Sequence, residues 1–273
     1  MREQAQKAFK ACLEHEGRSQ AIVPLVLQMC SDEWFTGRMS GCNLIPVAFK
    51  HATSKQKLAL KNNFFKMCDD KMPLVRRTAA KNISDFARSV PMDLLESEVI
   101  PKFESLSIHV NEKQIGLGSN DEMEFIKIVT IDHLHEMADL APNSETLLAI
   151  TRAAISDNSW KIRLSIAKQI DKLVNSFGKN VASLHLLDDL SALLRDNEGE
   201  VKRETVHSFT KCIHLLDLDK VKESSYFSVL KECYKEEYAD FKEGVAESIC
   251  EIAFHIDEHD VTDELIPIMV KLM

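Results

Sequence analysis

The sequence predicts an all-α fold built from repeated helix pairs. Apolar residues recur with helical periodicity, as in the stripe that starts at Ile162 and continues at positions 166, 170, 173, 174 and 177. No segment shows the alternation of apolar and polar residues that is typical of a half-buried strand. The 273 residues include only 8 Gly and 7 Pro, about 5% against an average near 12%, which is too few for the turns of a β-sandwich.

Composition narrows the class of protein further. Apolar residues make up 45% of the chain, enough for a sizeable core. The longest apolar run, 21–27, is far shorter than the roughly 20 residues of a membrane span, and no signal peptide precedes it. Seven scattered cysteines without C-x-x-C pairs indicate reduced thiols in a cytoplasmic, or also nuclear, protein. The net charge of −9 disfavours nucleic acid and membranes as partners.

A basic residue that follows an apolar one recurs near the start of every second predicted helix, at Arg76, Lys127, Arg163, Lys202 and Lys242. Arg2 and Arg38 lie in the same register, and the seven basic positions are separated by 36, 38, 51, 36, 39 and 40 residues. An acid stands six residues before each of them from Arg38 onward: Asp32, Asp70, Asp121, Asp157, Asp196 and Glu236. A period near 39 with two helices per unit is typical of a HEAT-type solenoid, whose units stack to bury their apolar faces. A generic helical bundle is the alternative.

The spacing between acid and base has a physical reason. An acid in the turn between two antiparallel helices can accept hydrogen bonds from the N–H groups that open the second helix. The basic residue lies about one and a half turns further on, where it can meet the turn acid of a neighbouring unit. We therefore predict a structural ladder of ion pairs along the stack.

The register predicts one domain of six full repeats between two half repeats. The expected units are 1–16 (second helix only), 19–52, 54–92, 93–143, 144–179, 180–217, 221–260 and 261–273 (first helix only). The excess in the fourth unit is placed in an inserted loop at 107–120, which has two glycines and no helical stripe. Neither end carries a polar cap, so a fragment of a longer array is expected.

Several stretches are more specific than a generic HEAT unit. They are Asp32-Glu-Trp-Phe-Thr-Gly-Arg, Pro73-Leu-Val-Arg-Arg, Ser97-Glu-Val-Ile-Pro-Lys-Phe and Asp157-Asn-Ser-Trp-Lys-Ile-Arg. In this order and spacing they resemble the scaffold (A) subunit of type-2A serine/threonine protein phosphatase. The resemblance covers nearly the whole chain apart from the inserted loop.

The resemblance implies a non-catalytic scaffold made of fifteen HEAT repeats. In that family a regulatory (B-type) subunit docks on the turns within the N-terminal repeats, and the catalytic subunit docks on the last few. The match runs from about the third repeat to the start of the tenth, so the chain would carry much of the regulatory-subunit platform. The catalytic subunit would bind only the full-length protein. Lys127, Lys202 and Lys242 replace the commoner Arg, which weakens bidentate pairing, and the longer loop could retune one docking position.

The turns supply the candidate docking residues. Trp34 and Trp160 stand close to a turn, where a core residue is not expected, although either could pack against a neighbouring repeat. Arg76 continues the ladder register, so the additional Arg77 is predicted to face a partner. Exposed Trp and Arg on adjacent turns are typical of interface hot spots. The predicted surface for the regulatory subunit consists of Trp34, Pro73, Arg77, Trp160 and Lys161.

An enzyme is the weakest of the functional alternatives. His255-Ile-Asp-Glu-His259 fits the H-x-x-E-H zinc-peptidase pattern, but the register places it where a second helix ends. No phosphate-binding, dinucleotide-binding or nucleophile-elbow motif is found. We predict no catalytic residue, metal or cofactor. Another acidic HEAT-repeat adaptor, such as a nuclear transport receptor for basic cargo, is the alternative function, and the tryptophan motifs favour the scaffold.

Overall fold

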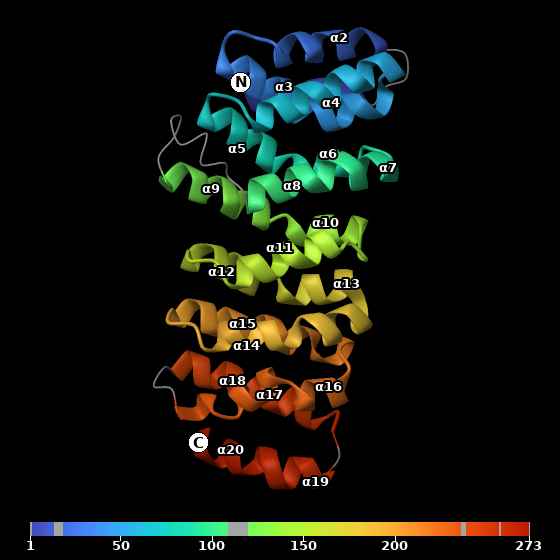
Figure 1. The fold of residues 1–273 in the computed structure, drawn as a ribbon. Helices are drawn as coiled ribbons and strands as arrows, with labels where there is room; N and C mark the ends of the chain where they lie inside the picture. The colour runs from blue at the N-terminus through green and yellow to red at the C-terminus, as the bar shows by residue number, and fades with distance from the viewer. Residues whose placement is uncertain (1, 14–18, 109–119, 236–238, 257, 273) are drawn as a thin grey trace. The chain divides into compact units, whose positions relative to one another are not determined.

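The computed structural model describes residues 2–13, 19–108, 120–235, 239–256 and 258–272 (Figure 1). All regular structure within these ranges is helical, which confirms the all-α prediction. The chain divides into two compact units, Met1–His133 and Leu134–Met273, which are described one at a time.

Unit 1 is a stack of helix pairs. Its elements are α1 Arg2–Leu13, α2 Ser19–Cys30, α3 Phe35–His51, α4 Ser54–Cys68, α5 Pro73–Lys81, α6 Ile83–Ala87, α7 Met92–Leu94, the π-helix η1 Leu95–Val99, α8 Ile100–Ser107 and α9 Asn120–Ile131. Within pairs, α2 packs on α3, α4 on α5 and α8 on α9. Between pairs, the second helices α3, α5 and α9 pack on one another in sequence order. Most of the predicted loop at 107–120 falls at 109–119, outside the described residues.

Unit 2 repeats this arrangement. Its elements are α10 Leu134–Leu140, α11 Glu145–Ile155, α12 Trp160–Ala167, α13 Ile170–His185, α14 Leu187–Leu194, α15 Gly199–Cys212, η3 Ile213–Leu215, α16 Leu218–Glu223, α17 Ser225–Leu230, η4 Cys233–Lys235, α18 Ala239–Ala253, α19 Glu258–Asp260, the π-helix η5 Val261–Leu265 and α20 Ile266–Leu272. The first helices α11, α14 and α17 pack in one row and the second helices α12, α15 and α18 in another (Figure 1).

Gly178 and two of the prolines lie where the regular α-helical backbone is interrupted. Gly178 divides α13 with a φ of 79°, a left-handed conformation that favours glycine, at the predicted end of a repeat. Both π-helices immediately precede a proline near the start of the next helix, Pro101 in α8 and Pro267 in α20. Because proline has no N–H and its ring clashes with the carbonyl four residues back, the turn before it widens.

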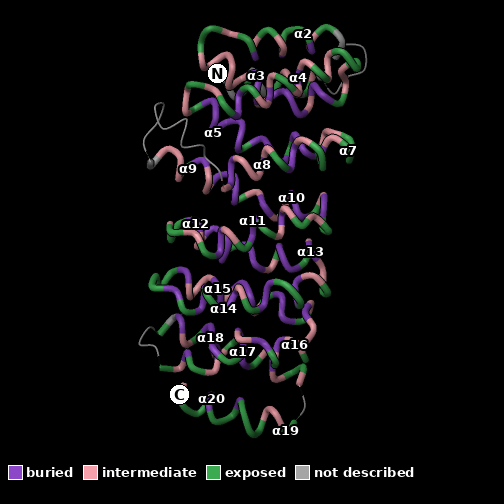
Figure 2. The backbone as a smooth tube through the Cα atoms, viewed as in Figure 1, coloured by how far each residue is buried: buried purple, intermediate pink, exposed green. Residues whose placement is uncertain are grey.

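The buried faces of the helices form the core of each unit (Figure 2). In unit 1, the Phe86 ring lies 4.3 Å from Phe64 and 5.5 Å from Phe49, measured between centroids. In unit 2, Phe209 and Tyr226 lie 3.9 Å apart in the same way. Full burial of such side chains contributes about 2–3 kcal/mol each. The Phe49–Phe86 and Phe209–Tyr226 contacts join helices of successive pairs, so part of the core lies between neighbouring pairs.

Several first helices begin differently from the second helices. Three first helices, α4, α11 and α17, have a side-chain cap, in which Thr53, Ser144 or Ser224 accepts a hydrogen bond from the backbone N–H three residues on. The second helices α3, α5, α12 and α15 have no such cap at the residue before the helix. Their starts are instead held by the turn aspartates.

Candidate protein-docking surface

Each turn aspartate holds the backbone of its own turn. Oδ1 accepts a hydrogen bond from the N–H two residues on, at 2.8–2.9 Å, in the pairs Asp32–Trp34, Asp70–Met72, Asp157–Ser159 and Asp196–Glu198. The N–H belongs to the residue just before the helix, rather than to the first helical residues as expected from the sequence. The short Asp side chain folds back onto its own turn, which fixes the direction of the following helix.

Two arginines link successive turns within a unit. In unit 1, Arg38 Nε and Nη2 donate to the Asp70 carboxylate at 2.7 and 2.9 Å, while Nη1 donates to the Asp32 carbonyl at 3.0 Å. In unit 2, Arg163 Nε and Nη2 donate to Asp196 at 2.5 and 2.9 Å, and Nη1 donates to the Asp157 carbonyl at 2.7 Å. One guanidinium therefore closes its own turn and holds the next turn bidentately, so neighbouring turns are kept in a fixed relation.

The electrostatics of these pairs favour their charged forms. Burial by itself raises the pKa of the Asp70 and Asp196 carboxyls. The arginine hydrogen bonds and the N–H groups of Met72 and Glu198 outweigh it, so the pKa of each carboxyl lies below its ordinary value of 3.8. The hydrogen bond to Asp196 likewise raises the pKa of Arg163.

The other ladder positions are described only in part. Arg76 is buried, with 6% of its surface exposed, and its Nη1 donates to the Asp70 carbonyl at 2.7 Å. Its expected partner Asp121 has a side chain outside the described part, and so does Glu236, the partner expected for Lys202. Lys127 and Lys242 are half-buried.

In unit 1 the structure brings a tryptophan and a stacked arginine to the turns. Trp34 directly precedes α3 and is 73% exposed, so it is not packed into a neighbouring repeat. Pro73 is the first residue of α5 and is half-buried. The guanidinium carbon of Arg77 lies 3.5 Å from the centroid of the Phe125 ring, a cation–π contact.

Sequence reasoning missed two apolar residues beside these. They are Leu74, which is 44% exposed, and Phe125, which is 37% exposed. Each stands two residues before a basic residue of the predicted ladder. The repeat pattern could have identified both residues, because equivalent positions in successive repeats lie on equivalent parts of the turn.

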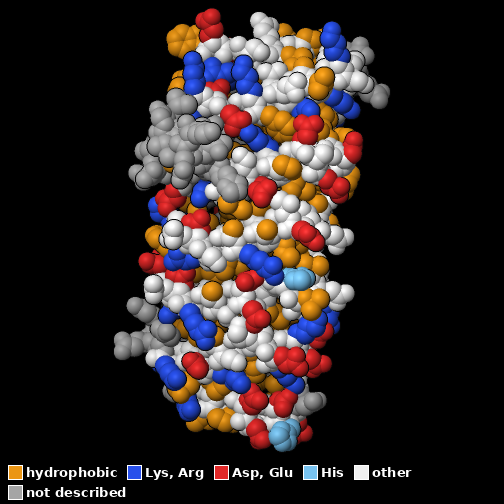
Figure 3. All heavy atoms as spheres, in the orientation of Figure 1, with side chains coloured by type: hydrophobic (Ala, Val, Ile, Leu, Met, Phe, Trp, Pro, Cys, Tyr) orange, Lys and Arg blue, Asp and Glu red, His pale blue; other side chains and the backbone are white. Residues whose placement is uncertain are grey.

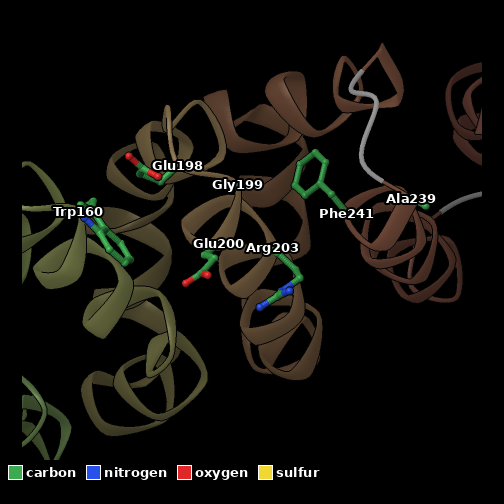
Figure 4. Close-up of a pocket in the computed structure, with 7 residues that line it drawn as sticks. All are labelled: Trp160, Glu198, Gly199, Glu200, Arg203, Ala239 and Phe241. Carbon is green, nitrogen blue, oxygen red and sulfur yellow. The ribbon is translucent and has the colours of Figure 1, made fainter.

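In unit 2 the predicted residues border a pocket. Trp160 is the first residue of α12 and is 37% exposed, and Lys161 beside it is exposed. Trp160 lines a pocket of about 630 Å³ together with Glu198, Gly199, Glu200, Arg203, Ala239 and Phe241 (Figure 4). Sequence reasoning missed those six residues. The repeat pattern could again have identified two of them. In the repeat register Glu200 is equivalent to Lys161, and Arg203 is equivalent to Arg77.

No arrangement typical of an enzyme is found in the described ranges. They contain no group of three or more His, Cys, Asp or Glu side chains that could hold a metal ion. His255 and His259 turn to different acids, Glu251 at 3.5 Å and Asp263 at 3.4 Å. On the face drawn in Figure 3 both signs of charge are interspersed. None of the described helices has the length and apolar character needed to cross a bilayer.

Comparison with known proteins identifies relatives of this chain. The HEAT repeat family matches residues 60–90, which span part of α4 and all of α5 and α6. The regulatory (A) subunit of protein phosphatase PP2A from Schizosaccharomyces pombe is 32% identical over 175 residues, covering 62% of this chain and 28% of the relative. The chain is a homologue of the PP2A scaffold subunit. This confirms the resemblance read from the turn motifs.

Other matches agree with this homology. The PP2A 65 kDa regulatory subunit of Drosophila melanogaster is 39% identical over 74 residues, covering 27% of this chain and 12% of the relative. Both names describe regulatory subunits of the phosphatase. The chain spans about a quarter of the fission-yeast relative.

Solved structures agree on the fold alone. A crystal structure of a Kap121p mutant superposes with a TM-score of 0.63 at 13% identity, over 98% of this chain and 27% of that one. A Kap95p complex with RanGDP gives a TM-score of 0.59 at 12% identity, over 91% and 32%. The HEAT/armadillo-like solenoid class is confirmed by these likenesses.

Proposed function

We propose that this chain is part of a non-catalytic scaffold that holds a regulatory subunit of a type-2A phosphatase on its intra-repeat turns. The docking residues are Trp34, Pro73 and Arg77 in unit 1 and Trp160 and Lys161 in unit 2. The catalytic subunit is the partner of the full-length protein. The observation that carries the proposal is the exposure of Trp34 on a turn that is otherwise held rigidly.

Rigid presentation makes these turns suited to binding. A partner that docks on a loop must also order it, whereas here Asp32 and Arg38 already fix the turn beneath Trp34. Arg77 is held in a similar way by its stack on Phe125. Large aromatic side chains and arginine contribute most of the energy at protein interfaces, and here the backbone that carries Trp34 and the guanidinium of Arg77 are already held in place.

The alternative of a nuclear transport receptor gains no support beyond the fold. The likeness to the Kap95p complex, whose description concerns nuclear import, is at 12% identity. Helical solenoids of unrelated function share this architecture. The sequence relatives are phosphatase subunits, so the scaffold is the function that we propose.

The Trp34→Ala variant tests the proposal. A hot-spot tryptophan contributes about 2 kcal/mol or more, so the affinity for a purified regulatory subunit should fall about 30-fold. Because Trp34 is 73% exposed, the melting temperature should stay within a few degrees of the parent. Leu58→Ala, at a 57% exposed position in α4, is the matched control and should bind as the parent does. Equal effects of both variants, or a binding loss that follows unfolding, would contradict the proposal.

A further inference from the structure

The pocket beside Trp160 has a chemical character of its own. It lies in unit 2 between the starts of three second helices, α12, α15 and α18, and has a volume of about 630 Å³. Figure 4 shows the first turn of α15, with Glu200 and Arg203, between Trp160 on one side and Phe241 on the other. This volume is in the range of sites that take small ligands or single side chains.

The lining combines an apolar part with two exposed carboxylates. The indole of Trp160 and the ring of Phe241 supply the apolar part, and Phe241 is only 3% exposed. Glu198 and Glu200 form no ion pair within the described residues, although Glu198 interacts electrostatically with Arg163, which is bound to Asp196. Arg203 is paired with Glu204 at 3.5 Å. The lining therefore offers two negative charges against one cation that already has a partner.

We propose that this pocket accepts the arginine or lysine side chain of a partner protein segment, with an apolar residue beside it. The methylene stem would lie against Trp160 and Phe241, as such stems do on apolar surfaces. The cationic head would meet Glu198 and Glu200, and the indole face adds a cation–π contribution. An acidic side chain would instead face two carboxylates, and the one cation in the lining, Arg203, already has a partner.

This inference rests on the proposed function in one respect, because it names the chemistry of the partner segment that docks at Trp160. It is specific to the α12–α15–α18 pocket. Binding through Trp34 and Arg77 in unit 1 does not depend on it.

Fluorescence of Trp160 provides the test. The chain has two tryptophans, so Trp34→Phe leaves Trp160 as the one indole reporter. The probe is the capped peptide Ser-Gly-Leu-Arg-Leu-Gly-Ser, and the comparison peptide has Glu in place of Arg. We expect a saturable change in Trp160 emission with the arginine peptide, and weaker binding of the glutamate peptide.

Three variants in the same background locate the binding. Glu198→Gln and Glu200→Gln should each weaken the arginine peptide by up to about fivefold, the range for partly exposed ion pairs. Gly199→Phe should abolish binding, because a Cβ built at Gly199 meets no atom within 4 Å and the ring can enter the pocket. Glu223→Gln, at an exposed carboxylate of α16 that does not line the pocket, is the matched control and should bind as the background does.

The outcomes separate this inference from the proposed function. The pocket assignment is overturned if the glutamate peptide binds as well as the arginine peptide, if the Gln variants bind unchanged, or if no saturable signal appears. If that happens while the chain with Trp34 intact still holds the regulatory subunit, the proposed function stands alone. If the peptide binds the pocket but the regulatory subunit does not bind the chain, the proposed function fails and the pocket assignment stands.

Discussion

Removal of the Asp196 charge should destabilise unit 2 far more than removal of a comparable exposed charge. In Asp196→Asn an amide oxygen at the Oδ1 position can still accept from the Glu198 N–H and from Arg163 Nη2, but the amide nitrogen cannot accept from Arg163 Nε, and the negative charge is lost. The guanidinium then lacks its counter-charge in a site where its side chain is only 18% exposed.

The expected cost follows from that geometry. Leaving one partner of a buried pair uncompensated costs about 3–5 kcal/mol. The cost falls below that range here, because Arg163 is partly exposed and Nη1 keeps its bonds to the carbonyls of Asp157 and Asn158. We therefore expect a loss of about 2–3 kcal/mol of unfolding free energy.

A second inter-repeat pair in the same unit supplies the control. Arg152 Nε contacts Asp189 at 2.8 Å, but the two side chains are 46% and 37% exposed. Exposed pairs contribute about 1 kcal/mol or less, so Asp189→Asn should cost less than that. Urea unfolding followed by circular dichroism, with Trp160 emission in the Trp34→Phe background as a local probe of unit 2, measures both. Equal costs for the two variants would refute the claim that burial gives the ladder its strength.

Three further predictions concern other positions. The pKa of Asp70 is depressed in the folded state, so the stability that the Asp70 carboxylate contributes is fully present above its unfolded pKa near 3.9 and is lost as the pH falls below that value. The difference in unfolding free energy between the parent and Asp70→Asn should therefore close when unfolding is measured at increasingly acid pH. Gly37→Ala should lose about 1–3 kcal/mol in urea unfolding, because its Cβ would overlap the Asp32 carboxylate, whereas Gly199→Ala, which meets nothing, should change stability by less than about 1 kcal/mol. Tyr226→Phe should raise the melting temperature, since the Tyr226 hydroxyl is buried without a hydrogen-bond partner among the described residues; a lower melting temperature would contradict that reading.

The fold and the pairing of turns were accessible from sequence because both are periodic. The spacing of six residues between acid and base recurs in repeat after repeat, so a contact such as Arg38–Asp70 could be anticipated from two positions 32 residues apart. The finer detail was not accessible. Whether Asp70 bonds the residue before the helix or one inside it depends on the local backbone angles of the turn.

The site itself was accessible only in part. Trp34 and Trp160 stand out in the sequence as large side chains next to turns. The stack of Arg77 on Phe125 could be predicted only by knowing that α9 packs on α5 as the next second helix. The 51-residue interval between Arg76 and Lys127, the longest in the repeat, obscures that relation. To predict the pocket, one must know how Trp160, Glu200 and Phe241 are arranged across three turns, and no single sequence motif contains that information.

Hydrogen–deuterium exchange of the chain with and without a purified regulatory subunit tests the central claim most directly. The account predicts slower exchange in the turn segments 31–38, 70–77 and 157–163, which hold Trp34, Arg77 and Trp160. Segments of the first helices, such as 55–66 of α4, should exchange at the same rate in both samples. Protection confined to the first helices, with unchanged exchange in all three turn segments, would contradict the account.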